Sequence, residues 1–320
     1  MAATQVGWIG LGSMGIGMSK NLQKHLSSTS APPLIYTNRT ISRGDPLKAI
    51  GAVAAESVGE VAKKSDIIFS CVSDDAALRH VADEIVASGN INGKVYVDCS
   101  TVHPDTSVAI SKQISESGAE FVAAPVFGAS AVAEAGKLIF VTAGPSTATS
   151  RIVPYLNGVM GRSVIDMGTE VSKSSLLKIA GNVCVISFME VICEAHVFAE
   201  KTGLGPAILE KMLGDMFGPI IESYSKRVTT GAYVPEPGGK AGFDVQLAIK
   251  DIKHALNSAT AAGTSLEVSE IALKHLQKAK SLVSDRPLDS SSIYGAIRTE
   301  ADLDFFSDVC KKRDGMGSET

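Results

Sequence analysis

The sequence lacks the features expected of a nucleic-acid-binding or disulfide-stapled protein. Its 30 Lys and Arg residues are outnumbered by 34 Asp and Glu residues, so no basic excess is present to contact nucleic-acid phosphates. The five cysteines are odd in number and widely spaced, mostly in apolar runs, which predicts reduced and buried thiols without a disulfide framework. Neither they nor the six histidines show metal-ligand spacing. Small molecules and copies of the chain itself are the partners we expect.

The sequence also has no segment that suggests export or membrane insertion. An apolar run begins at residue 6, which leaves no room for a removable leader. The most apolar long stretch, residues 176–198, contains five polar side chains that would be costly in hydrocarbon: Lys178, Asn182, Glu190, Glu194 and His196. We therefore expect a buried helix there, no membrane contact and a cytoplasmic protein.

Short apolar runs separated by helical patterns fill the first half of the chain. They lie at residues 6–9, 34–37, 66–72, 94–98, 120–124, 137–143 and 163–166. This alternation predicts an α/β fold with a doubly wound, largely parallel sheet covered by helices on both faces.

From residue 170 onward the sequence has helical periodicity and no convincing strand. Helices are predicted at residues 171–201, 208–227, 243–262 and 266–282, with a frayed tail from residue 311. Since 320 residues exceed what one core usually organises, we expect an α/β domain over 1–167, an interdomain helix over 168–200 and an all-α C-terminal domain over 201–320.

A glycine turn follows the first predicted strand and opens the first predicted helix. It reads Gly10-Leu11-Gly12-Ser13-Met14-Gly15. The first glycine permits the tight turn, the second lets the backbone approach a diphosphate, and the third lets the helix pack on the strand. In this setting the motif predicts a dinucleotide-binding Rossmann domain, with an ordinary turn as the alternative.

The end of the second predicted strand indicates which dinucleotide is bound. A site selective for NAD usually has an acidic residue here, whereas this chain has Asn38-Arg39-Thr40. The guanidinium of Arg39 can grip a 2′-phosphate, Asn38 and Thr40 offer further donors, and Arg43 adds positive charge. The segment favours NADP over NAD, with an exposed basic loop as the alternative.

Four segments in order along the chain carry a family resemblance. They are the glycine turn with Met18, Asn21 and Leu22; the loop Asp98-Cys99-Ser100-Thr101-Val102-His103-Pro104; the segment Lys178-Ile179-Ala180-Gly181-Asn182; and the pair Lys250-Asp251. Together they resemble the β-hydroxyacid dehydrogenases, the family of 3-hydroxyisobutyrate dehydrogenase and tartronate semialdehyde reductase within the 6-phosphogluconate dehydrogenase superfamily. The resemblance implies a Rossmann domain, a long helix leading to an all-α domain, a cleft between the domains, and homodimers or homotetramers.

The resemblance and the residues both point to Lys178 as the general acid/base. It lies in a strongly apolar helix, where desolvation lowers a lysine pKa, and Asn182 follows one turn later to orient the substrate. Thr101 is expected to touch nicotinamide or substrate, with a helix N-cap as its other role. Lys250 is expected near the cofactor, or else as a solvated charge. Val72 and Ser73 are placed in a cofactor-side loop that also caps a helix.

One segment departs from the family pattern. The family commonly has Pro-Val-Ser-Gly-Gly, whose serine and glycine amides hold the substrate carboxylate, where this chain has Pro125-Val126-Phe127-Gly128-Ala129. The amides of Gly128 and Ala129 can still face an anion, but Phe127 adds apolar bulk and has no side-chain donor. We therefore expect a bulkier or less anionic substrate.

The sequence predicts an NADP-dependent oxidoreductase that transfers a hydride between nicotinamide and a small hydroxy acid, semialdehyde or related carbonyl. Two alternatives stay open. Phe127 keeps an imine reductase-like enzyme in view, although Lys178 with Asn182 argues against it. A non-catalytic NADP-binding module would bind the cofactor without turnover.

Overall fold

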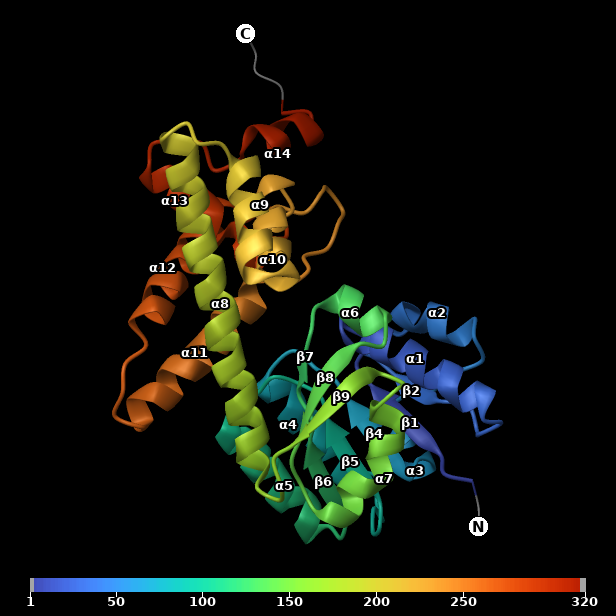
Figure 1. Cartoon of the computed structure of the whole chain (residues 1–320). Coiled ribbons are helices and arrows are strands. Elements are labelled where there is room, and N and C mark those ends of the chain that lie inside the picture. The colour runs from blue at the N-terminus through green and yellow to red at the C-terminus, as the bar shows by residue number, and fades with distance from the viewer. Residues whose placement is uncertain (1–2, 317–320) are drawn as a thin grey trace. The chain divides into compact units, whose positions relative to one another are not determined.

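The computed structural model describes residues 3–316, and the chain divides into two compact units, with the boundary at Ile179 and Ala180 inside one long helix. In the first unit a six-stranded parallel sheet has the strand order β3-β2-β1-β4-β5-β6 (Figure 1). Its strands are β1 (Val6–Ile9), β2 (Ile35–Thr37), β3 (Val53–Ala54), β4 (Ile67–Ser70), β5 (Val95–Asp98) and β6 (Glu120–Ala123). This order confirms the predicted doubly wound Rossmann sheet.

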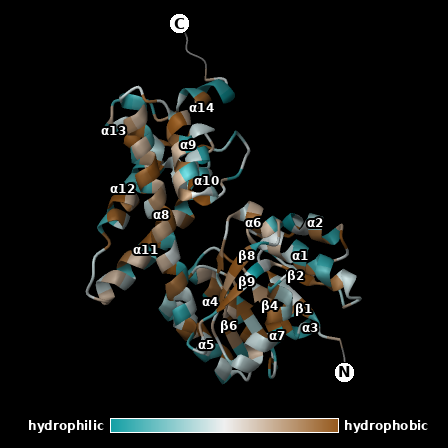
Figure 2. Ribbon diagram, in the orientation of Figure 1, coloured by the Kyte–Doolittle hydropathy of each residue, from teal (hydrophilic) through white to brown (hydrophobic). Residues whose placement is uncertain are grey.

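Apolar cores cover both faces of this sheet, because successive side chains of a strand point to opposite sides. Phe69 packs in one core with residues of α1, and the next strand residue back, Ile68, packs in the other core with residues of α3 to α5. Figure 2 shows the strands largely brown, with more teal on the surrounding helices and loops. The helices of this unit are α1 (Gly15–Ser28), α2 (Asp45–Lys48), α3 (Val58–Lys64), α4 (Asp75–Ala87), α5 (Pro104–Glu116), α6 (Ser130–Glu134) and α7 (Ser146–Leu156), with the 3₁₀ turn η1 (Ile41–Gly44).

A second, three-stranded sheet completes the first unit. It contains β7 (Val126–Phe127), β8 (Leu138–Thr142) and β9 (Gly161–Asp166), with β7 antiparallel and β9 parallel to β8. The prediction of one sheet was therefore wrong, and it missed β3 and β7. Both missed strands are two residues long, which is too short to show a hydrophobic period.

The second unit is helical, as predicted. Its elements are the greater part of α8 (Val171–Lys201), then α9 (Pro206–Phe217), α10 (Pro219–Thr229), α11 (Val245–Ala261), α12 (Glu267–Leu282), η2 (Ser290–Ser292), α13 (Ile293–Glu300) and α14 (Asp308–Arg313). The single helix expected over residues 208–227 is wrong. Gly218 has φ +82° and precedes Pro219, so the chain breaks there into α9 and α10.

Helix α8 is long and apolar enough to cross a membrane by length and composition alone. Its polar side chains, however, are paired with other helices of the second unit. Glu190 contacts His275 of α12 at 2.6 Å, and His196 contacts Ser225 of α10 at 2.7 Å. These buried pairs make α8 a core helix of the helical unit.

The five cysteines are thiols outside any disulfide, and their predicted burial is only partly correct. Cys184, on α8, is exposed and Cys71 is half-buried, whereas the other three are buried. Helical periodicity explains the difference for Cys184, because an apolar helix of this length still presents one side to solvent.

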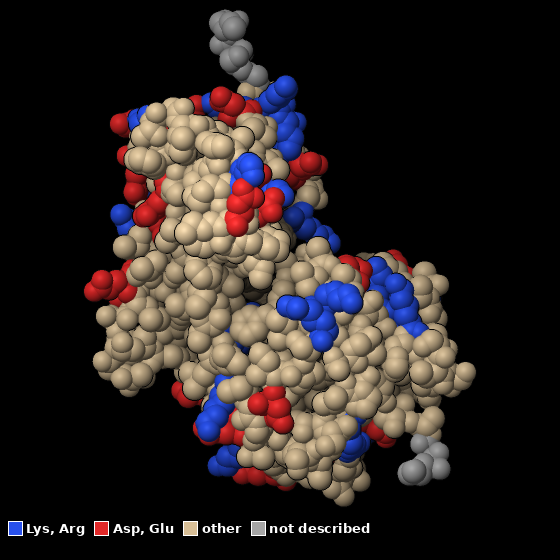
Figure 3. Space-filling view, viewed as in Figure 1, with Lys and Arg blue, Asp and Glu red and all other residues tan. Residues whose placement is uncertain are grey.

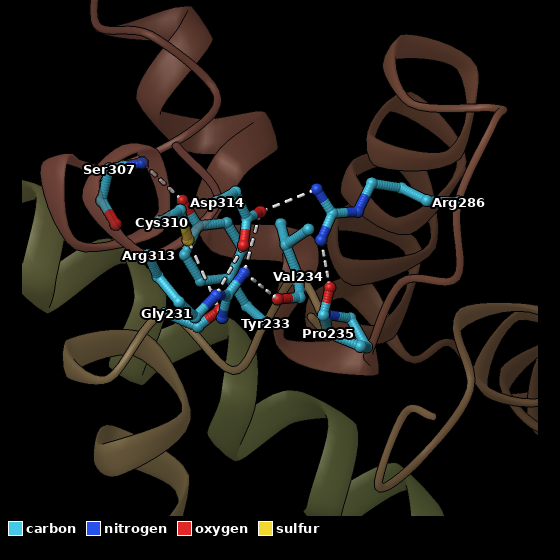
Figure 4. A network of polar contacts seen from close by, with 9 residues as sticks. All are labelled: Gly231, Tyr233, Val234, Pro235, Arg286, Ser307, Cys310, Arg313 and Asp314. Atoms are coloured by element: carbon cyan, nitrogen blue, oxygen red, sulfur yellow. Dashed lines mark hydrogen bonds and ion pairs between the residues drawn. The ribbon is translucent and has the colours of Figure 1, made fainter. Parts of the chain in front are cut away.

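The end of the described chain is also more ordered than the sequence suggested. Asp314 accepts hydrogen bonds from Arg313 Nε and Arg286 Nη1, each at 2.7 Å (Figure 4). These two guanidiniums lower the pKa of the Asp314 carboxyl to about 2. The frayed tail predicted from residue 311 is therefore wrong for 311–313, which lie in α14, while 317–320 fall outside the described residues.

Candidate cofactor and catalytic site

The glycine turn has a geometry that only glycine permits at two of its positions. Gly10 has φ +94°, and a Cβ there would lie 2.4 Å from the carbonyl oxygen of Cys71. A Cβ at Gly15 would lie 2.2 Å from the carbonyl oxygen of Gly10. The indole of Trp8 fixes that same oxygen by donating from Nε1 at 2.8 Å. The turn between β1 and α1 is therefore held by close main-chain packing.

Gly12 differs from these two glycines, because a Cβ there would meet nothing within 4 Å. The protein itself does not require a glycine at this position, so the open space suits a ligand that approaches the backbone. Ser13 is exposed and Met14 half-buried beside it. The N-terminus of α1 has no side-chain cap and no acidic residue in its first turn. These residues fit the diphosphate of a dinucleotide.

A pocket of about 430 Å³ opens at the end of β2. Arg39 and Asn38 line it together with Glu56, and the remaining lining residues are Thr37, Ile41, Ala54 and Ala55. Glu56 could not be recognised from the sequence, because it follows β3, the short strand that the hydrophobic pattern does not show. The pocket therefore presents one guanidinium and one carboxylate to whatever occupies it.

One of the predicted donors at this pocket, the Asn38 side chain, is engaged in fixing the loop. Asn38 Oδ1 accepts from the amide of Leu11 at 2.8 Å, and Asn38 Nδ2 donates to the carbonyl of Thr40 at 2.7 Å. Leu11 is buried, and Thr40 is the N-cap residue of η1. Asn38 thus ties the glycine turn to the end of β2, while Arg39 and Arg43 are exposed.

A buried polar network orders the loops that follow β4 and β5. Asp98 Oδ1 accepts from Ser70 Oγ and from Ser100 Oγ, both at 2.7 Å. Ser100 Oγ in turn accepts from the amide of Val72 at 2.8 Å. The loops carrying Val72 and Thr101 are therefore joined at the carboxyl edge of the sheet, next to the glycine turn of β1, where doubly wound folds bind their ligands.

Two capping roles at this edge can be assigned. Asp74 is the N-cap of α4 and accepts from the amide of Ala77 at 2.9 Å, so the segment from Ser73 caps a helix as expected. The N-cap of α5 is His103, followed by Pro104. The alternative role of Thr101 as that N-cap is therefore wrong.

Lys178 lies in the first unit, near the start of α8. Ser174 Oγ donates to the carbonyl of Val141 at 2.6 Å, and Ser175 Oγ contacts Ser107 Oγ at 2.8 Å, so the first turns of α8 are fastened to the α/β unit. Lys178 Nζ lies 4.7 Å from the centroid of the Phe127 ring, within the range of a cation–π contact. The structure brings together the predicted acid/base and the residue that departs from the family pattern.

The segment around Phe127 has a constrained backbone. Phe127 ends β7 and pairs with Ile139 of β8. Gly128 follows with φ +134°, and a Cβ there would lie 2.7 Å from Leu138 Cδ2. Ala129 is the N-cap of α6, a helix of only five residues.

The second unit holds the other predicted residues in one chain of contacts. Asn182 Nδ2 donates to Asp251 Oδ2 at 2.6 Å, and Lys250 Nζ lies 2.9 Å from Asp251 Oδ1. Asn182 and Asp251 are buried. Asp251 fixes the amide of Asn182, a role that the sequence did not reveal although it showed the Lys250-Asp251 pair. Among residues 3–316, no group of three or more His, Cys, Asp or Glu is placed to hold a metal ion.

Two family models match the chain. Residues 5–168 match the NAD-binding domain of 6-phosphogluconate dehydrogenase, and residues 173–297 match the NAD-binding domain of NADP-dependent 3-hydroxyisobutyrate dehydrogenase. Among curated relatives, the NADH-dependent oxidoreductase ucdB of Aspergillus ustus is 32% identical over 91% of this chain and 98% of its own length. Glyoxylate/succinic semialdehyde reductase 2 of Arabidopsis thaliana is 31% identical over 93% of this chain and 80% of its own length.

Solved structures share the fold at lower identity. The 3-hydroxyisobutyrate dehydrogenase of Mycobacterium tuberculosis, with L-serine, has a TM-score of 0.75 at 23% identity and covers 93% of this chain and 100% of its own. An imine reductase from Pseudomonas sp. has a TM-score of 0.61 at 20% identity and covers 92% and 100%. Sequence and fold together establish that the chain belongs to the β-hydroxyacid dehydrogenase family and is an NAD(P)-dependent oxidoreductase that acts on CH–OH groups.

Proposed function

We propose that this protein is an NADP-dependent enzyme that transfers a hydride between nicotinamide and a small hydroxy acid, semialdehyde or related carbonyl. Lys178 is its general acid/base. The observation that carries the proposal is the position of Lys178, which α8 and two serine contacts hold in place within the α/β unit of a family of hydroxyacid and semialdehyde oxidoreductases.

In the direction of reduction, bound NADPH supplies the hydride that reaches the carbonyl carbon. The Lys178 ammonium gives a proton to the carbonyl oxygen as that oxygen gains negative charge, and the same amine takes the proton back from the alcohol in oxidation. Asn182 orients the substrate through its amide, whose Nδ2 is fixed on Asp251. Thr101, Gly128 and Ala129 face the substrate in this proposal, and Lys250 contributes positive charge on the cofactor side.

The preference for NADP is supported by the pocket at the end of β2. Arg39 lines it, and the acid that an NAD-selective site places at the end of this strand is replaced by Asn38. The Glu56 carboxylate in the same lining works against a phosphate, and one relative is named NADH-dependent. The cofactor choice therefore depends on whether the charge of Arg39 exceeds that of Glu56 at the 2′ position.

The substitution Lys178→Ala tests the catalytic role. We expect kcat for reduction to fall at least 100-fold, because a positioned general acid contributes about 10²- to 10⁴-fold. Binding of NADPH should be unchanged when measured by fluorescence titration. The matched control is Lys173→Ala, which removes an exposed lysine from the same helix and should leave kcat unaltered. Unchanged turnover in Lys178→Ala would contradict the role of Lys178 as the general acid/base.

A second candidate, an imine reductase-like activity, is favoured by one observation. Phe127 gives the site the apolar wall that an uncharged imine needs, and an imine reductase shares the fold. Turnover of cyclic imines at rates above those of aldehydes would support this candidate. Tight NADPH binding without turnover of either class would instead favour a non-catalytic binding module.

We also propose a cytoplasmic homodimer or homotetramer. The support for association is a set of exposed apolar side chains on α8, α9 and their neighbours, on a unit whose surface in Figure 3 has wide areas without charged residues. Its exposed members are Phe188, Val191, Phe198, Leu204, Ile208, Met212, Met216, Phe217 and Ile220. Phe198 is 66% and Met216 71% exposed, which is unusual for a surface left in water. Sedimentation velocity and cell fractionation test these two points.

A further inference from the structure

The distance between Lys178 and Phe127 limits what a substrate can place beside its carbonyl group. A carbonyl oxygen that takes a proton from Lys178 lies about 3 Å from Nζ at the moment of transfer. Because Nζ lies only 4.7 Å from the ring centroid of Phe127, a carbonyl group bound at Nζ can place one substituent of its carbon against that ring. Phe127 is half-buried, so part of its surface is available for such contact.

The backbone that carries the Phe127 ring is fixed by its surroundings. Phe127 lies in the β7–β8 ladder opposite Ile139, and the next residue, Gly128, has a backbone conformation and packing that exclude a side chain. Lys178 is on a helix whose first turns are fastened to the same unit through Ser174 and Ser175. The backbone segments that carry the aromatic ring and the proton donor therefore belong to the same packed unit.

The chemistry of the ring selects between substituents. The face of an aromatic ring carries the negative part of its quadrupole, which attracts the Lys178 ammonium and repels a carboxylate. A carboxylate against this ring would also lose water without gaining a side-chain hydrogen bond, since phenylalanine has no donor. An apolar or aromatic substituent would instead bury surface and stack.

We propose that Phe127 is a specificity-determining residue that directs this enzyme to carbonyl compounds whose carbonyl carbon bears an uncharged apolar group, aryl groups above all, in place of a carboxylate. The inference rests on the proposed function, because it uses Lys178 as the group that defines where the carbonyl lies. It narrows the substrate class within that function to aldehydes and ketones without an adjacent carboxylate.

The test compares two aldehydes that differ in one substituent. Benzaldehyde carries a phenyl ring on the aldehyde carbon, and glyoxylate carries a carboxylate. With NADPH, the wild-type enzyme should show at least tenfold higher kcat/KM for benzaldehyde. Phe127→Ser should lower that ratio at least 30-fold, whereas Phe127→Tyr, which keeps the ring, should change it less than threefold. Ile165→Ser is the control, because it removes an exposed apolar side chain from β9 of the same small sheet.

A binding measurement separates recognition from catalysis. NADP⁺ has no hydride to give to benzaldehyde, so calorimetry with that pair gives the dissociation constant of benzaldehyde without its reduction, and this constant should be at least tenfold larger in Phe127→Ser. If Phe127→Ser does not fold, Phe127→Leu is measured instead. It keeps apolar bulk without the ring, and its ratio should fall at least threefold.

The outcomes distinguish this inference from the proposed function. A wild-type preference for glyoxylate, or an unchanged ratio in Phe127→Ser (in Phe127→Leu where that variant replaces it), would overturn the role of Phe127. Loss of activity in Lys178→Ala alongside such a result would leave the proposed function standing. Full activity of Lys178→Ala toward both aldehydes would instead overturn the proposed function itself.

Discussion

The two units of this protein use polar groups in different ways. In the α/β unit, the predicted cofactor site is made largely of main chain, with Gly10, Gly12 and Gly15 in one turn. In the helical unit, charged side chains pair between helices: Glu190 and His275 are both buried, and the buried Arg298 pairs with the exposed Glu200. The glycines of the α/β unit leave room for a ligand at the main chain, whereas paired charged side chains hold the helices of the other unit together.

This contrast explains what can be read from the sequence. The glycine turn spans six consecutive residues, so the spacing of its glycines is enough to predict the geometry of the turn. Glu190 and His275 are 85 residues apart, and Asn182 and Asp251 are 69 apart. No local pattern indicates such a pair, and only the packing of α8 against α11 and α12 creates it.

The sharpest way to break the comparison is to add one methyl group to the turn. Gly12→Ala should leave the unfolding free energy within about 0.5 kcal/mol of wild type, because its Cβ meets nothing in the protein. Its NADPH dissociation constant should rise at least 100-fold, because the methyl group occupies the space proposed for the diphosphate. Fluorescence titration and chemical denaturation give the two quantities.

Gly15→Ala is the counterpart. Its Cβ would collide with the Gly10 carbonyl, so we expect the unfolding free energy to fall by about 2 kcal/mol. If Gly12→Ala destabilised the fold as much as Gly15→Ala while NADPH still bound normally, the proposal that the diphosphate binds beside Gly12 would be wrong.

The helical unit should respond to pH through His275. The hydrogen bond with Glu190 raises the pKa of His275 above its ordinary value, despite the opposing effect of burial. A raised folded-state pKa contributes stability that is complete below about pH 6.5 and is lost as the pH rises through the folded value. Glu300 also faces the ring, at 3.4 Å from Nε2, and is itself paired with Lys278.

Glu190→Gln tests this dependence. Over pH 6–9, the Tm of wild type should decline with rising pH, while that of the variant should be nearly flat and lower at pH 6 by the equivalent of about 2 kcal/mol. Glu194→Gln, an exposed site on the same helix, is the control and should follow wild type. Parallel curves for all three proteins would show that the pair does not titrate in this range.

The smallest effect is expected at the rim of the cofactor pocket. Arg39→Ala should reduce the preference for NADPH over NADH about tenfold, since one exposed guanidinium on a phosphate is worth about 1.4 kcal/mol in affinity. Arg43→Ala, in the neighbouring η1 turn, should change the ratio less. The ratio of the two dissociation constants is the measurement, and an unaltered ratio in Arg39→Ala would contradict its phosphate role.

Most of the helices and strands could be predicted from the spacing of hydrophobic residues. The short strands and the break between two helices could not, because that spacing does not show them. The parallel sheet and α8 were predictable because long or repeated apolar patterns define them. β3 and β7 were not, since two residues carry no period, and the break at Gly218 was hidden by apolar residues that keep their spacing on both sides of it. The missed strand β3 is also why Glu56 was not recognised as part of the pocket.

The sequence by itself determined the glycine turn, the doubly wound sheet and the order of the family segments, because each is encoded in neighbouring residues. The tertiary structure alone decided that Asn38 ties the turn to β2, that Asp251 fixes Asn182, and that the Phe127 ring lies against Lys178. The two hydrogen bonds join residues that are 27 and 69 positions apart in the sequence. Their partners are chosen by packing in three dimensions, since side chains distant in sequence meet only once the elements that carry them have docked.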